Sequence, residues 1–164
     1  MYQADVQLQD ASQYEFNEIG VMGEQIPMNV DNVHLSGPVC SNCSFNWSGS
    51  STITFLQGNY TVSYVGPLQD SHLQAVFEMP YHVNVTLPQE FDVRNPLLAG
   101  LSLGADVTHQ PDNTTTIQWD NVTSIDLRFY DQGREQLLYF FGSIWIVIAI
   151  AFLLPYLMST RKKE

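Results

Sequence analysis

The uncharged segment Leu137–Met158 constrains this chain more than any other feature of its sequence; it reads LLYFFGSIWIVIAIAFLLPYLM. At about 1.5 Å per residue, a helix of this length crosses a hydrocarbon core of about 30 Å. Apolar residues would surround such a helix on every side, and aromatic residues gather near its first turns, where rings favour the lipid headgroups. The segment therefore predicts one transmembrane helix.

Basic residues predict how this helix is oriented. Arg161, Lys162 and Lys163 follow the apolar segment, whereas Arg134 on the other flank stands among acidic residues. Because basic residues favour the cytoplasmic side, we expect the C-terminus in the cytoplasm and everything before the helix outside the cell membrane.

The part that precedes the helix is strongly acidic. Residues 1–136 contain sixteen aspartates and glutamates but no lysine and only three arginines, Arg94, Arg128 and Arg134. Such a surface repels phosphate backbones, so we expect no nucleic-acid partner. The expected partners are the membrane and other membrane or envelope proteins, and the sequence names no small-molecule ligand.

Acceptor triplets for N-glycosylation also place this part outside. About one or two N-x-S/T triplets are expected by chance from the asparagine and hydroxyl content, and six are present. The acceptor residues are Asn42, Asn46, Asn59, Asn84, Asn113 and Asn121. We therefore predict a glycoprotein, with the best occupancy at Asn59 and Asn113, which we place in turns.

Cys40 and Cys43 are the only cysteines, and they form a single C-x-x-C motif. A zinc site needs four ligands, and neither a second C-x-x-C nor a paired histidine motif is present. A redox pair of the thioredoxin type opens a helix, whereas Ser41, Asn42 and Ser44 favour a turn. We predict a structural disulfide and keep a redox-active pair, free thiols and metal binding as alternatives.

Alternating apolar and polar residues predict strands in the outer part, beginning with residues 4–9. Gly58-Asn59 predicts a tight hairpin between two such runs, and Met79-Pro80 separates two others. The remaining runs are 33–35, 52–55, 60–64, 72–77, 83–87, 105–107, 115–119 and 125–129. Short strands without a soluble helix predict a mainly β fold, an antiparallel β-sandwich-like outer domain.

These patterns divide the chain into four parts. We expect a β-rich extracytoplasmic domain over residues 1–130, a membrane-proximal linker over 131–136, the transmembrane helix over 137–158 and a basic tail over 159–164. Even fully extended, a linker of this length reaches about 20 Å. The outer domain is therefore expected to stay close to the bilayer.

Motifs for catalysis are missing from the sequence. There is no nucleophile elbow and no phosphate-binding glycine loop, and the four histidines show no ligand spacing. Asp92 and Arg94 could form a recognition corner, although an ion pair within a loop is the simpler interpretation. We expect no enzyme activity, no cofactor and no metal site.

Several segments together resemble a known family. They are GNYTVSY, YHVNVTLPQEFDVRNPLLAG, IDLRFYD and REQLLYFFGSIWIVIAIAFLLPYL, within residues 50–158. They resemble an archaeal family of membrane proteins, known mainly from methanogens and catalogued only as a domain of unknown function. The resemblance implies a place in the archaeal cell envelope, a β-rich outer domain and an N-terminal export signal. Because residues 1–5 lack such a signal, we expect a trimmed N-terminus or a start assigned too late.

Two functions fit these observations. The first is a non-catalytic binding or structural module of the cell envelope, and the second is an envelope thiol–disulfide protein that uses Cys40 and Cys43. The reactivity of the thiols, and whether the motif opens a helix, distinguishes them.

Overall fold

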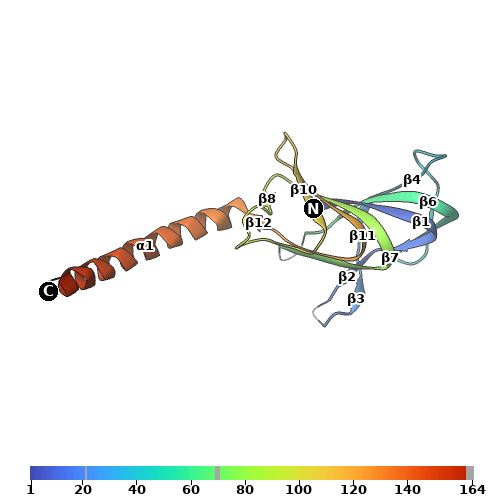
Figure 1. Ribbon diagram of the computed structural model, residues 1–164. Helices are drawn as coiled ribbons and strands as arrows, with labels where there is room; N and C mark the ends of the chain where they lie inside the picture. Colours follow the sequence, from blue (N-terminus) through green and yellow to red (C-terminus); the bar gives the residue numbers. More distant parts are fainter. Residues whose placement is uncertain (21, 69–70, 162–164) are drawn as a thin grey trace. The chain divides into compact units, whose positions relative to one another are not determined.

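The computed structural model describes residues 1–20, 22–68 and 71–161. The chain forms two compact units, Met1–Tyr130 and Asp131–Glu164. The first unit is mainly β with antiparallel sheets, as predicted, and the second contains the C-terminal helix (Figure 1). The strands are β1 (Tyr2–Glu15), β2 (Asn17–Ile19), β3 (Gln25–Pro27), β4 (Asp31–Ser36), β5 (Asn46–Trp47), β6 (Thr52–Gly66), β7 (His72–Leu87), β8 (Phe91–Asp92), β9 (Gly100–Leu101), β10 (Ala105–His109), β11 (Thr115–Arg128) and β12 (Tyr130–Asp131), and the helix is α1 (Gln132–Arg161).

One large sheet builds the first unit. Its strand order is β10-β11-β7-β1-β6-β4, and the short strands β5 and β9 pair with β6 and β11. Two separate two-stranded sheets, β2–β3 and β8–β12, complete the unit. The four long strands β1, β6, β7 and β11 contain 14 to 16 residues each and form the centre of the sheet.

The core forms because buried and exposed side chains alternate along these strands. Val6 lies opposite Val62 on β6 and opposite Val83 on β7, and Val83 in turn lies opposite Trp119 on β11. Residues opposite one another in antiparallel strands share a face, and all four of these side chains are buried. One continuous apolar face therefore runs across the sheet.

Three breaks predicted between strands are wrong. β6 continues through Gly58-Asn59, β7 continues through Met79-Pro80, and β11 joins the runs 115–119 and 125–129. Asn59 consequently lies within a strand and not in a hairpin turn. Short strands were expected because turn-forming residues interrupt the apolar pattern. In the structure, each strand continues through the interruption.

Irregular pairing explains how the strands continue. The register of β1 with β6 shifts between Leu8 and Ala11, where Asp10 has φ +49° and Gly58 lies opposite Ala11. The register of β11 with β7 shifts after Trp119, where Asn121 has φ +55°. Such bulges bend a strand and leave a residue unpaired, so polar residues are accommodated inside a long strand.

Pro80 is accommodated in the same way. Proline has no N–H to donate and is confined to unpaired positions in sheets. The register of β7 with β11 skips residues 77–80, and the register of β7 with β1 ends at His82. The proline therefore sits where the ladder is already open.

The second unit begins with a capped helix. Asp131 Oδ1 accepts the N–H of Arg134 at 2.9 Å, which satisfies one of the free amides of the first turn. α1 includes the whole predicted span 137–158 but starts at Gln132. Residues 132–136, expected to be a linker, are therefore helical, because the cap and good helix formers start the helix early.

The helix is long and apolar enough to cross a membrane. The candidate span is Gly133–Leu154, and none of it is buried in the structure. Ser143 Oγ donates to the carbonyl of Phe140 at 2.7 Å, so this hydroxyl is satisfied within the helix. Of the predicted basic tail, 159–161 belongs to α1, and Lys162, Lys163 and Glu164 lie outside the described residues.

Candidate functional site

The C-x-x-C motif closes a short loop after β4. Cys40 and Cys43 form a disulfide with a Cα–Cα distance of 5.4 Å, as predicted. The N–H of Cys43 donates to the carbonyl of Leu35 at 2.7 Å, and the N–H of Gly37 donates to the carbonyl of Cys40 at 2.8 Å. Cys43 is buried against the core. The bond and the backbone hydrogen bonds together fasten the loop to the end of β4.

The surroundings of the disulfide are those of a turn. Residues 37–45, all of which the structure describes, contain no helix, so the motif does not open one. A ring nitrogen of His34 lies 2.7 Å from the carbonyl oxygen of Ser41, between the two cysteines, and holds the loop further. Activated thiolates depend on a helix N-terminus or a nearby cation. The local geometry therefore favours a structural role for the bond.

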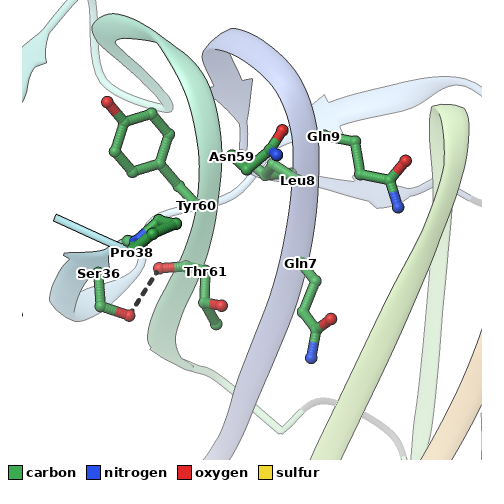
Figure 2. Close-up of a pocket in the computed structure, with 9 residues that line it drawn as sticks. Gln7, Leu8, Gln9, Ser36, Pro38, Asn59, Tyr60 and Thr61 are labelled. Atoms are coloured by element: carbon green, nitrogen blue, oxygen red, sulfur yellow. Dashed lines mark hydrogen bonds between the residues drawn. The ribbon is translucent and has the colours of Figure 1, made fainter.

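This loop forms one wall of an open hollow in the first unit (Figure 2). The hollow has a volume of about 470 Å³, and its other walls come from β1 and β6. Its lining residues are Gln7, Leu8, Gln9, Ser36, Gly37, Pro38, Asn59, Tyr60 and Thr61. Sequence reasoning missed this site, because strands β1, β4 and β6 meet there only through long-range pairing.

Close packing shapes the hollow. A Cβ on Gly37 would lie 2.9 Å from a ring carbon of Tyr60, so glycine lets the loop approach this ring. Tyr60 packs edge-on against Phe55, with ring centroids 5.1 Å apart. Ser36 Oγ donates to the carbonyl of Thr61 at 3.5 Å (Figure 2). The lining offers amides, hydroxyls and one aromatic ring, which suits a polar, uncharged group.

One of the predicted acceptor asparagines lies in this lining. Asn59 Oδ1 accepts the N–H of Asp10 at 2.8 Å, which holds the side chain across the bulge of β1. Of the other acceptors, Asn42, Asn46, Asn113 and Asn121 are exposed and Asn84 is half-buried. Asn113 has φ +63° in the turn between β10 and β11, where it was predicted. The glycosylation acceptor Asn59 and the disulfide loop therefore both line the hollow.

Histidines pair with aspartates across β7 and β11. His72 Nε2 lies 3.0 Å from an oxygen of Asp126, and His82 Nδ1 lies 2.7 Å from an oxygen of Asp120. The hydrogen bonds from His82 and then from Gln118 lower the pKa of the Asp120 carboxyl. Both pairs lie on exposed positions outside the hollow. They act as cross-strand pairs on the solvent side of the sheet.

Asp92 and Arg94 form the ion pair that was the simpler interpretation of this loop. The buried carboxylate of Asp92 accepts the N–H of Val93 at 2.7 Å, the N–H of Arg94 at 2.9 Å and the Nε–H of Arg94 at 2.7 Å. The hydroxyl of Tyr130 accepts the N–H of Asn95 at 3.1 Å. These bonds fix the segment after β8, and they satisfy the Asp92 carboxylate with groups of the protein itself.

Metal ligands do not gather elsewhere in the part of the chain that the structure describes. Within residues 1–20, 22–68 and 71–161, no group of three or more His, Cys, Asp or Glu side chains could hold a metal ion.

A comparison with known protein families gives a match over almost the whole chain. The model of a family of unknown function, DUF5803, matches residues 2–163, which is almost the whole chain. Neither a curated protein nor a solved structure matches. The match agrees with the resemblance to a family of unknown function.

Proposed function

The chain belongs to the DUF5803 family of unknown function, and from its own residues we propose a non-catalytic module of the cell envelope, anchored by a single transmembrane helix. The β-rich unit serves as a binding or structural domain for other membrane or envelope proteins. The resemblance seen in the sequence adds that this envelope is archaeal.

The observation that carries the proposal is the absence of a spacer between the last described strand and the helix. β12 ends at Asp131, and α1 begins at Gln132. Asp131 is both the end of the strand and the cap of the helix. A domain joined in this way has no free linker with which to search for distant soluble ligands. Partners in the same membrane, or at the inner face of a surface layer, suit it best.

The arrangement of reactive side chains supports a role without catalysis. Asp92 is occupied by Arg94, and the two histidines on β7 are paired with aspartates. General acid–base catalysis needs such groups to converge on one cavity. In the described structure the hollow is lined instead by amides, hydroxyls and a phenol.

Charge and acceptor triplets support the placement outside the cell. The basic residues Arg161, Lys162 and Lys163 favour a cytoplasmic C-terminus. Five of the six acceptor asparagines are exposed on the β-rich unit, where a glycosyltransferase reaches them. We propose an external glycoprotein on this basis.

The thiol–disulfide alternative is supported by the presence of the bond alone. The cysteines lie in a turn, and Cys43 is buried, which disfavours attack by or on its sulfur. The structural role therefore stays the preferred interpretation.

Crosslinking in cells of the native host, followed by mass spectrometry, tests the proposal. Links from the β-rich unit should lead mainly to membrane or envelope proteins. Inserting a flexible Gly/Ser segment of about 20 residues, which spans roughly 25 Å, after Asp131 should change the set of links. Turnover of a substrate by the purified protein, or an unchanged set of links, would contradict the proposal.

A further inference from the structure

An uncharged loop with exposed leucines lies in an otherwise acidic unit. Residues 95–105, here called the leucine loop, read NPLLAGLSLGA and carry no charge. Leu97 is 80% exposed, Leu101 37% and Leu103 95%. Single exposed leucines are common on protein surfaces, but three within seven residues concentrate exposed apolar side chains on one loop, which suggests a partner.

The backbone of the leucine loop is held in place. The N–H groups of Leu98 and Ala99 donate to the carbonyl of Asn95 at 3.0 and 2.9 Å, and Asn95 Oδ1 accepts the N–H of Leu97 at 3.1 Å. Ser102 exchanges two hydrogen bonds with the backbone of Asp126. The exposed leucines are therefore presented by a fixed turn.

Pairing fastens the leucine loop to the residues that lead into the helix. On β9, Gly100 lies opposite Arg128 and Leu101 lies opposite Leu127. From Arg128 to Gly133, where the candidate span begins, the chain advances five residues, at most about 18 Å. The connectivity alone therefore keeps the leucine loop near the point where the chain enters a membrane.

The positions of the arginines also indicate a membrane surface next to the leucine loop. Two arginines of the β-rich unit flank the leucine loop: Arg94 just before it, where it pairs with Asp92, and Arg128 opposite it on β11. Arg134 follows in the first turn of α1, where it pairs with Asp131. Lipid surfaces attract apolar side chains together with flanking cations, because acyl chains and phosphates lie next to each other there.

We propose that Leu97, Leu101 and Leu103 insert into the interfacial region of the bilayer that α1 crosses, with Arg128 beside a lipid phosphate. The contact gives the β-rich unit a second attachment to the membrane and limits its rotation about the first turn of α1. This inference rests on the membrane anchor of the proposed function and adds the lipid surface as a direct partner of the outer domain.

Site-specific fluorescence on the full chain tests this contact. Because both native cysteines are joined, Leu103→Cys provides one reactive thiol for an environment-sensitive dye such as NBD. The labelled chain is reconstituted into vesicles of phosphatidylcholine and phosphatidylglycerol. Relative to the control described below, the dye at 103 should emit at shorter wavelength, its quenching by iodide should at least halve, and lipids spin-labelled near the headgroup should quench it.

Leu56→Cys is the matched control. Leu56 is 83% exposed and lies on β6, which is three strands away from β11 in the sheet. The dye at 56 should stay open to iodide and insensitive to the spin-labelled lipids. Far-UV circular dichroism of each labelled variant confirms that the fold is retained.

Ile148→Cys, inside the candidate span, separates this inference from the anchor itself. If lipids spin-labelled deep in the acyl chain quench the dye at 148 but lipids spin-labelled near the headgroup do not quench the dye at 103, the leucine loop does not touch the bilayer and this inference is wrong. If the dye at 103 is shielded from iodide but is not quenched by the spin-labelled lipids, protein covers the leucine loop instead of lipid. This result also overturns the inference. If the dye at 148 is not quenched, the anchor fails, and both proposals fall.

Discussion

At the scale of single residues, Asp92 shows how one buried carboxylate fixes a loop. Burial raises the pKa of this carboxyl, but the hydrogen bonds from the Arg94 side chain and from the N–H groups of Arg94 and Val93 outweigh that effect. The pKa of Asp92 in the folded state therefore lies below its ordinary value. The charged form stabilises the fold, and the loop that precedes the exposed leucines depends on it.

We expect Asp92→Asn to lower the free energy of unfolding by about 1.5–3 kcal/mol, the range for lost hydrogen bonds to a charged group. Asp126→Asn, which removes an exposed pair with His72, should cost no more than about 0.5 kcal/mol. Urea denaturation of the full chain in detergent micelles at pH 7 measures both. Equal losses for the two variants would contradict the importance given to Asp92.

The same residue predicts a dependence on acid. Because the pKa is lowered on folding, the stabilisation by Asp92 is complete above the unfolded pKa of about 3.9 and disappears as the pH falls through the folded value. The difference between wild type and Asp92→Asn should therefore shrink below about pH 4. A difference that persists undiminished at pH 2 would count against the pKa assignment.

Three buried tyrosines predict a dependence on base. Burial is the largest effect that raises the pKa of Tyr2, Tyr14 and Tyr64, whose hydroxyls lie together in the core. Above the unfolded value of about 10, the unfolded chain loses these protons first, so stability should fall by roughly 1.4 kcal/mol per pH unit for each tyrosine. Tyr14→Phe should make this slope shallower. Denaturation between pH 9 and 11.5 that shows no loss of stability would contradict the burial of these hydroxyls.

At the scale of elements, the disulfide loop is the clearest case of local stabilisation. Alkylation of the unreduced protein should leave both Cys40 and Cys43 unmodified in a mass spectrum, and free thiols in the native protein would contradict the bond. Replacing both by serine should lower the free energy of unfolding by about 2 kcal/mol, the loop-entropy term for so short a loop. Proteolysis near Pro38 should become faster in this variant, because the loop then frays.

The position of each acceptor within its element predicts its occupancy by glycan. Asn113 lies exposed in a turn and Asn121 exposed at a bulge, whereas Asn84 lies half-buried between Asp5 and Gln118 on the neighbouring strands. Glycopeptide mapping of protein from its native host should therefore find Asn113 and Asn121 occupied far more often than Asn84. All six acceptors bare would remove this support for an external location.

At the scale of the whole molecule, the two units predict a simple pattern of protection. Protease added to intact cells should digest Met1–Tyr130 and spare a fragment that contains α1 and the tail. A mass spectrum of the membrane fraction identifies that fragment. A β-rich unit protected in intact cells but cleaved after lysis would reverse the proposed orientation.

Several features followed from local sequence alone. The span 137–158 needs only length and the absence of charge to be predicted as a helix, since backbone groups in lipid must be satisfied internally. The alternation around Val6 and Val83 predicted strands, and the turn-forming residues around Cys40 and Cys43 favoured a disulfide between them over the alternatives for a C-x-x-C motif. These properties depend on neighbours within a few residues.

Pairing between distant segments decided the rest. In the sequence, Gly58-Asn59 and Met79-Pro80 look like interruptions between strands. Nothing in the sequence shows that a bulge of β1 lies opposite Gly58, or that the pairing of β7 is open beside Pro80, so that both strands continue. The hollow beside Tyr60 exists because β1, β4 and β6 are neighbours in the sheet. The leucine loop is held at the end of β11 because β9 pairs there. Side-chain period sets which face of a strand is buried, but only the tertiary register sets which strands meet.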